Sequence, residues 1–206
     1  MKRGRVYATF TARGGRRVVL RALRRTDLDG LLKFANAIVK ERRTNLEMGI
    51  VSLDKRVRRS DEKKFLERIL LGIRRKEVIS VAAFVGEKVV GNCDISRRRL
   101  TDIRHTGLFG IVILDGYRGI GIGQMMVKTA LEEAFRGGVW LVELDVFAIN
   151  EVAIHVYEKL GFKKAGVVPD KMLRHGRLLD EIHMYVDLRK RVTPGMYLQP
   201  GVVRPR

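Results

Sequence analysis

A glycine-rich loop between two hydrophobic segments constrains this chain more than any other feature. Gly119, Gly121 and Gly123 alternate in it, after an apolar run and before a long amphipathic segment. Glycine lets successive backbone N–H groups converge on one point, and the first N–H groups of a following helix add positive potential. Arg118 adds a cationic donor at the rim. The pattern predicts a strand, an anion-binding loop and a helix in that order.

The spacing of these glycines argues against two common nucleotide-binding loops. A P-loop requires a lysine after its last glycine, and Gln124 stands there instead. A dinucleotide-binding loop requires G-x-G-x-x-G/A, and Gln124 or Met126 occupies the position of the third small residue. Glu143, twenty residues after Gly123, keeps one trait of dinucleotide-binding folds. The loop nevertheless follows an expected antiparallel hairpin halfway along the chain, so we reject that interpretation.

Hydrophobic periodicity predicts a single α/β (α+β) domain at residues 17–188. A basic N-terminal extension, residues 1–16, would precede it and end in a flexible break, and a basic C-terminal tail, residues 189–206, would follow it. The expected elements are strands at 18–20, 78–85, 89–96, 105–114, 139–147, 162–168 and 182–188, and helices at 26–39, 60–73, 121–136 and 150–160. A polar connection is expected at 170–180.

The charge of the chain is concentrated at its two ends. The net charge is +19, yet residues 1–25 hold nine Lys or Arg and residues 188–206 hold five, with no acid in either segment. Basic ends of this kind suit weak contact with nucleic acid, although a solvated surface is the simpler interpretation. A basic rim also attracts an anionic cofactor.

Other features of the composition bear on the compartment. Cys93 is the single cysteine, which fits a reducing cytoplasm, so we expect a cytoplasmic protein. No stretch of about 18 apolar residues occurs, so no membrane span is expected. Two Gln and four Asn against heavy use of Arg, Lys and Glu are typical of a thermophile.

Two motifs together resemble those of the GNAT superfamily of N-acetyltransferases. The first, Arg118-x-x-Gly121-x-Gly123, resembles its acetyl-CoA loop. The second is the Asn-x-x-Ala-x-x-x-Tyr-x-x-x-Gly-Phe segment that starts at Asn150, includes Tyr157 and ends at Phe162. The resemblance covers about residues 17–188. It implies a GNAT fold, in which helices flank a mixed, mostly antiparallel sheet and a splayed strand pair forms the acyl-CoA cleft.

The resemblance also implies the cofactor site. Acetyl-CoA would be the cosubstrate, and its pantetheine arm would pair with the strand before the loop. The implied cofactor-binding residues are Ile111, Val112, Ile113, Arg118, Gly119, Ile120, Gly121, Ile122, Gly123, Asn150 and Tyr157. The chain departs from many relatives at Asp115, where they have proline, and this loosens the turn before the loop.

The implied chemistry is attack by a neutral amine on a thioester. Tyr157 is the candidate proton donor to the leaving thiolate, and a packed aromatic residue is the alternative. Asp145 is the candidate proton acceptor, and structural pairing is the alternative. His105 and Cys93 are more simply a surface residue and a buried thiol. The four histidines show no metal-ligand spacing with Cys93, so no metal is predicted.

The acceptor is less defined than the cofactor. Residues 161–166, 175–177 and 180–181 resemble the amino-acid and phosphinothricin type of acetyltransferase, so a small amine or amino acid is favoured. Asn45 and Glu47, between the first two helices, are the candidate substrate-binding residues. A RimI-like acetyltransferase of peptide N-termini and a non-catalytic acyl-CoA-binding or RNA-associated module remain alternatives. The acyl length stays open, and so does a homodimer.

Overall fold

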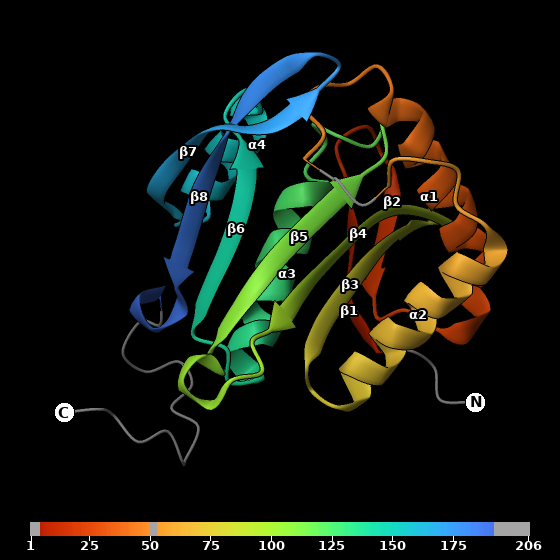
Figure 1. Cartoon of the computed structure of the whole chain (residues 1–206). Helices are drawn as coiled ribbons and strands as arrows, with labels where there is room; N and C mark the ends of the chain where they lie inside the picture. The colour runs from red at the N-terminus through yellow and green to blue at the C-terminus, as the bar shows by residue number, and fades with distance from the viewer. Residues whose placement is uncertain (1–4, 50–52, 192–206) are drawn as a thin grey trace.

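A computed structural model describes residues 5–49 and 53–191 of the chain. One eight-stranded sheet runs through it in the order β1-β2-β3-β4-β5-β6-β8-β7 (Figure 1). The strands are β1 (Val6–Thr11), β2 (Arg17–Arg21), β3 (Val78–Val85), β4 (Lys88–Arg97), β5 (Thr106–Ile113), β6 (Leu141–Phe147), β7 (Lys163–Arg174) and β8 (Arg177–Asp187). The helices are η1 (Arg25–Asp27), α1 (Leu28–Arg42), α2 (Arg59–Arg74), η2 (Thr101–Ile103), α3 (Ile122–Arg136), α4 (Glu151–Lys159) and η3 (Leu188–Arg191).

Helices cover both faces of this sheet. Helices α1 and α2 pack on one face, where Leu31, Ile38 and Leu66 form a core with Ala82 and Phe84. Helices α3 and α4 pack on the other face, in a larger core that includes Met126 and Tyr157. The strands alternate accordingly, because successive side chains of a strand point to opposite faces. No helix among the described residues combines the length and the apolar character needed to cross a membrane.

Strands β5 and β6 separate along their length, and this opens the centre of the sheet. They pair in parallel at only three positions, from Thr106 opposite Leu141 to Leu108 opposite Glu143. Beyond Leu108, β5 continues on β4, while β6 is paired with β8 as far as Phe147. The expectation of a mixed, mostly antiparallel sheet with a splayed strand pair is confirmed.

The expected order of elements was wrong at the N-terminal end. Residues 6–11 were assigned to an extension, but they form β1, an edge strand that is antiparallel to β2. The expected flexible break at Arg13–Arg16 is the hairpin turn between them, closed by the Ala12 N–H donating to the Arg16 carbonyl at 2.9 Å. Arg5 forms an ion pair with Glu133 of α3 at 2.8 Å. Residues 1–4 of the extension and 192–206 of the tail lie outside the described residues.

The last two strands are longer than the hydrophobic pattern indicated. Strands β7 and β8 continue through the segment expected to be a polar connection, down to the pair Arg174 and Arg177. The turn between them has positive φ at both central residues, 51° at His175 and 73° at Gly176. Such a turn matches the twist of an antiparallel pair. The hairpin reaches across the end of the sheet toward α1 (Figure 1).

Candidate active site

The glycine loop joins β5 to α3 and lies against the β1–β2 turn. Gly119 and Gly121 have φ of 71° and 94°, values that glycine adopts readily and other residues rarely do. Arg13 of the β1–β2 turn holds two loop carbonyls. Its guanidinium donates to the Gly119 carbonyl at 2.6 Å, and its backbone N–H donates to the Ile120 carbonyl at 3.1 Å.

These two contacts orient the opposite side of the loop. In a trans peptide the C=O and the following N–H point in opposite directions. The chain has no cis peptide among its described residues, so carbonyls turned toward Arg13 turn the N–H groups of Ile120 and Gly121 away from it. No acceptor among the described residues takes either N–H. The first N–H groups of α3 follow directly and are also free of helical partners. The loop therefore presents unpaired N–H groups on the side away from Arg13.

Arg118 has a different position from the one expected. Its Nε and Nη2 donate to the Ile113 carbonyl at 2.9 and 2.7 Å, and its Nη1 contacts the Glu41 carboxylate. Arg16 supports the same region, because it donates to the Gly116 carbonyl at 2.5 Å and lies over the Tyr117 ring. Arg118 and Arg16 thus fix the base of the loop, whereas Arg118 was expected to be a cationic donor at its rim.

Arg13→Ala should weaken the binding of acetyl-CoA about tenfold, since a hydrogen bond from a charged group contributes about 1.5 kcal/mol and 1.4 kcal/mol is a factor of ten. The turnover number should change little, because Arg13 lies on the side of the loop away from the cavity described below. Calorimetry with acetyl-CoA and dephospho-CoA measures the effect. Equal losses for both ligands indicate that Arg13 positions the loop, and a loss confined to acetyl-CoA would show a direct contact with the 3′-phosphate instead.

The open edge of β5 offers backbone groups to the cleft. The Leu114 N–H donates to the Val90 carbonyl at 2.9 Å, so alternate residues back to Gly110 turn their backbone groups toward β4. Phe109, Ile111 and Ile113 turn theirs toward the space that β6 has left. The Ile113 carbonyl accepts from Arg118. Ile111 is the residue whose N–H and C=O face the cleft between β5 and β6.

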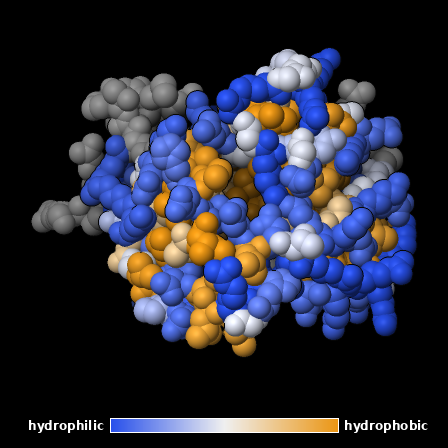
Figure 2. All heavy atoms as spheres, turned by 90° about the horizontal axis from the view of Figure 1, so that it is seen from above, coloured by the Kyte–Doolittle hydropathy of each residue, from blue (hydrophilic) through white to orange (hydrophobic). Residues whose placement is uncertain are grey.

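A cavity of about 830 Å³ passes through this gap in the sheet. Figure 2 shows the opening as a hollow with hydrophobic atoms deep inside it and hydrophilic atoms around its rim. Its wall includes Ile111 and Val112 of β5, Asp145 of β6, and Asn150 and Tyr157 from the α4 side. The structure brings these residues of β5, β6 and α4 together, whereas Ile113, Arg118 and residues 119–123 are not part of this wall.

Tyr157 lies in an aromatic cluster at the edge of the cavity. Its side chain is 8% exposed, and its ring centroid is 5.6 Å from that of Phe162 and 6.2 Å from that of Phe109. Burial raises the pKa of the Tyr157 phenol well above its ordinary value, and the Cys93 thiol adds to the rise. A raised pKa keeps the phenol protonated near neutral pH, which suits a proton donor and not a base.

Asn150 links α4 to the loop between α1 and α2. Its Oδ1 accepts from the Ala153 N–H at 3.0 Å as the N-cap of α4, and its Nδ2 donates to the Glu47 carbonyl at 3.0 Å. Arg174 from the tip of the β7–β8 hairpin contacts the Met48 carbonyl of the same loop. The loop is therefore held over the cleft from two sides. The side chains of Asn45 and Glu47, expected to bind substrate, are outside the cavity wall, and Asn45 Oδ1 accepts from the Glu47 N–H.

Asp145 pairs with a histidine at the mouth of the cavity. Its Oδ1 is 2.7 Å from Nδ1 of His183 on β8, and the His183 Nε2 is 3.9 Å from Oε1 of Glu143. Glu143 also forms an ion pair with Arg98. The Asp145 side chain is 42% exposed, so this row of charges lies in contact with solvent. Both expected roles, proton acceptor and structural partner, are compatible with this position.

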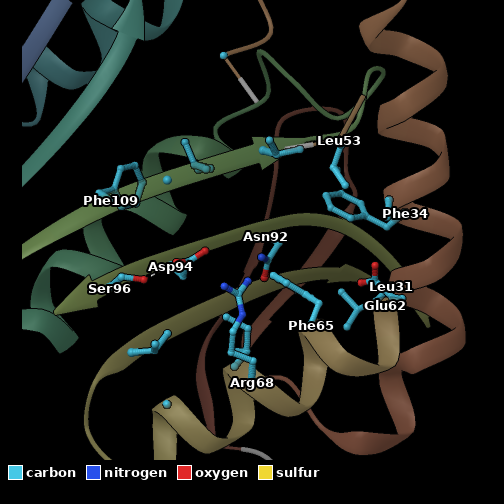
Figure 3. Close-up of a pocket in the computed structure, with 18 of the residues that line it drawn as sticks. Leu31, Phe34, Leu53, Glu62, Phe65, Arg68, Asn92, Asp94, Ser96 and Phe109 are labelled. Carbon is cyan, nitrogen blue, oxygen red and sulfur yellow. Dashed lines mark hydrogen bonds between the residues drawn. The ribbon is translucent and has the colours of Figure 1, made fainter. Parts of the chain in front are cut away.

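The structure also shows polar cavity residues that the sequence analysis missed. Arg68 of α2 faces Asn92 and Asp94 of β4 across the cavity, and Glu62 of α2 lies farther along the wall beside Leu31 (Figure 3). Burial raises the pKa of both Glu62 and Asp94. The Asn92 Oδ1 is buried and has no hydrogen-bond partner among the described residues. Successive side chains of β4 point to opposite faces of the sheet, so the sequence separates Asn92 and Asp94 from the core side chains of this strand. Only the packing of α2 shows that Asn92 and Asp94 line a cavity.

Two other candidates lie away from the cavity wall. Cys93 points to the opposite face of β4 from Asp94, is fully buried, and has a thiol pKa raised by burial. His105 stacks against Trp140 at a ring distance of 5.3 Å. Within residues 5–49 and 53–191, no three His, Cys, Asp or Glu side chains are arranged to hold a metal ion.

Comparison with known families agrees with this geometry. A model of the Acetyltransferase (GNAT) family matches residues 47–162, which is more than half of the chain and contains the glycine loop, the cleft and α4. The chain belongs to the GNAT acetyltransferase family. The expected fold and family are thereby confirmed.

Individual relatives are distant. The chain is similar to the Escherichia coli L-amino acid N-acyltransferase MnaT, with 25% identity over 97 residues, and to the L-amino acid N-acetyltransferase AaaT of the same organism, with 28% over 114 residues. The matches cover 47% and 53% of this chain and 56% and 68% of those relatives. Among solved structures, a GNAT acetyltransferase from Streptococcus pneumoniae superimposes with a TM-score of 0.71 and 25% identity, covering 82% of this chain and 99% of that one.

Proposed function

We propose that this protein transfers an acetyl group from acetyl-CoA to the primary amine of a small molecule, with amino acids as the favoured class. The observation that carries the proposal is the open β5 edge beside the cavity that reaches Tyr157, with the glycine loop following β5 directly along the chain. An anionic diphosphate fits the free N–H groups of the loop. An extended arm fits the unpaired edge at Ile111, as an added strand would.

Each part of the site has a role in this reaction. Holding the amine and the thioester together in one cavity removes much of the entropic barrier to their reaction. The Ile111 N–H, turned into the cleft, donates to the oxyanion that forms when the amine attacks. Tyr157, kept protonated by burial, gives a proton to the sulfur as it leaves.

Two observations favour a small acceptor. The cavity is enclosed on the acceptor side by Phe34, Leu53 and Phe65 together with the polar residues of α2 and β4 (Figure 3). The loop between α1 and α2 is also held down by Asn150 and Arg174, which narrows the entry for a folded partner. The relatives MnaT and AaaT are named for amino-acid acceptors, in agreement with this size.

A thiol-release assay tests the proposal. Acetyl-CoA is presented with a panel of amino acids, polyamines and peptides, and the free thiol of CoA is measured. Release that depends on a small amine, with mass-spectrometric detection of its N-acetyl product, is the expected result. Preference for peptides would indicate an acetyltransferase of N-termini. Binding of acetyl-CoA without release for any amine would indicate a non-catalytic acyl-CoA-binding module.

A further inference from the structure

Asp94 occupies a place in the cavity that gives it access to the reacting atoms. In the antiparallel pairing of β4 with β5 it stands directly opposite Gly110, on the face covered by α1 and α2. A methyl group built on Gly110 would meet no atom within 4 Å, so the space beside the Asp94 carboxylate is open. Side chains directly opposite in such a pair lie about 5 Å apart at Cβ, and here one of the two is missing.

This open space adjoins the part of β5 that would polarise the thioester. Gly110 precedes Ile111, the residue whose N–H faces the cleft. An acyl carbonyl held by that N–H would lie one residue along β5 from the position opposite Asp94. An amine that approaches from the α2 side of the cavity reaches it past the carboxylate of Asp94 (Figure 3).

The groups around Asp94 tune its basicity. Ser96 Oγ donates to its Oδ2 at 3.3 Å, and Ser80 stands opposite it on β3. Arg68 of α2 faces it across the cavity and Glu62 lies farther along that wall (Figure 3), while Asp145 of β6 lines the same cavity. Burial raises the pKa of the Asp94 carboxyl, while Ser96 and Arg68 lower it by a smaller amount. A carboxylate of raised pKa is a stronger proton acceptor than an ordinary one.

We propose that Asp94 is the catalytic base that takes a proton from the ammonium group of the acceptor. The proposal rests on the acetyltransferase function proposed above. The rival is Asp145, whose Oδ1 is already engaged by His183 at 2.7 Å and whose carboxylate is open to solvent. Asp94 is less exposed and is engaged, among the described residues, by the hydroxyl of Ser96 alone.

The protons balance as follows. The ammonium gives one proton to Asp94, and the neutral amine then forms a C–N bond with the thioester carbon. The C–S bond breaks as the tetrahedral intermediate collapses, and Tyr157 gives its phenolic proton to the sulfur. The second proton of the amine nitrogen restores the Tyr157 phenol through water, and Asp94 releases its proton to solvent. The products are the amide, the CoA thiol and one proton.

The test compares Asp94→Asn with Asp145→Asn over a range of pH, using an amine substrate found in the thiol-release screen. In the unsubstituted protein, activity should rise with pH as Asp94 loses its proton. Asp94→Asn should move this acid limb to the pKa of the amine and, below that pKa, lower kcat/KM for the amine by about 100-fold, as expected for loss of a general base. The deficit should shrink as the pH approaches the pKa of the amine, because the free amine needs no base. The affinity for acetyl-CoA, measured by calorimetry, should be retained.

Controls separate this role from packing. Glu62→Gln removes another buried acid of the same wall, and it should keep the acid limb whatever it does to the KM of the amine. Asp94→Glu should restore part of the rate, even if Asp94→Asn folds poorly. An acid limb that stays in place in Asp94→Asn, or one that moves in Asp145→Asn, overturns the proposal while the acetyltransferase function stands. If the unsubstituted protein releases no thiol with any amine, the proposed function and the role of Asp94 both fail.

Discussion

Tyr157→Phe should lower kcat by about 100-fold or more, the usual range for loss of a proton donor. The substitution removes one oxygen and keeps the ring that packs against Phe109 and Phe162. The folded structure and the affinity for acetyl-CoA should therefore change little. Because burial raises the pKa of this phenol, the loss should be similar from pH 6 to 9, where the hydroxyl stays protonated.

Stopped-flow or steady-state thiol release measures kcat, and calorimetry measures acetyl-CoA affinity. Thermal unfolding of the same variant supplies the control for stability. Loss of acetyl-CoA binding with unchanged turnover of the bound complex would assign Tyr157 to packing and not to proton transfer.

Gly121→Val should reduce the affinity for acetyl-CoA by about tenfold or more. The φ of Gly121 is 94°, and a residue with a Cβ costs about 1–2 kcal/mol or more in left-handed backbone geometry, with β-branched side chains the least tolerated. The loop must then move, and the N–H groups of Ile120 and Gly121 lose the direction that Arg13 gives them. The expected loss appears in the KM of acetyl-CoA and not in that of the amine.

Gly86→Val is the matched control for this prediction. Gly86 also has a positive φ, 57°, and an added methyl group there meets nothing within 4 Å. It lies in the β3–β4 turn, outside the cavity wall and the loop. Both variants should lose a similar amount of stability in thermal unfolding, but only Gly121→Val should lose cofactor binding. Equal binding by the two variants would remove the glycine loop from the cofactor site.

Local signals predicted the strand, loop and helix around the three glycines and the helix that carries Tyr157. Alternating glycines impose their own backbone geometry, and the seven-residue spacing of Asn150 and Tyr157 places both on one side of a short helix. The acceptor half could not be predicted in this way. Arg68 and Asp94 face one cavity because α2 packs on β3, the strand beside β4, and no short-range pattern encodes that contact.

The errors in the fold have a common physical origin. The alternation of Tyr7 and Thr9 with Ala8 and Phe10 indicates a strand, but the dense positive charge around it is equally typical of a solvated tail. Residues 163–171 of β7 are all exposed, so this strand shows no alternation of buried and exposed residues there. The His175-Gly176 pair, which tolerates the positive φ of a tight hairpin turn, was the remaining signal.

The contact between the β1–β2 turn and the glycine loop has a consequence for biosynthesis. Arg13 and Gly119 are 106 residues apart, so Arg13 leaves the ribosome long before Gly119 is synthesised. The nascent chain must keep β1 available until α3 has emerged. If acetyl-CoA binds the finished loop as proposed, it favours the completed fold through mass action. A chain without residues 1–15 would still contain the strands and helices around the cleft, yet it would lack Arg13, which orients the loop. A measured affinity for acetyl-CoA should therefore indicate whether the β1–β2 turn is packed against the glycine loop.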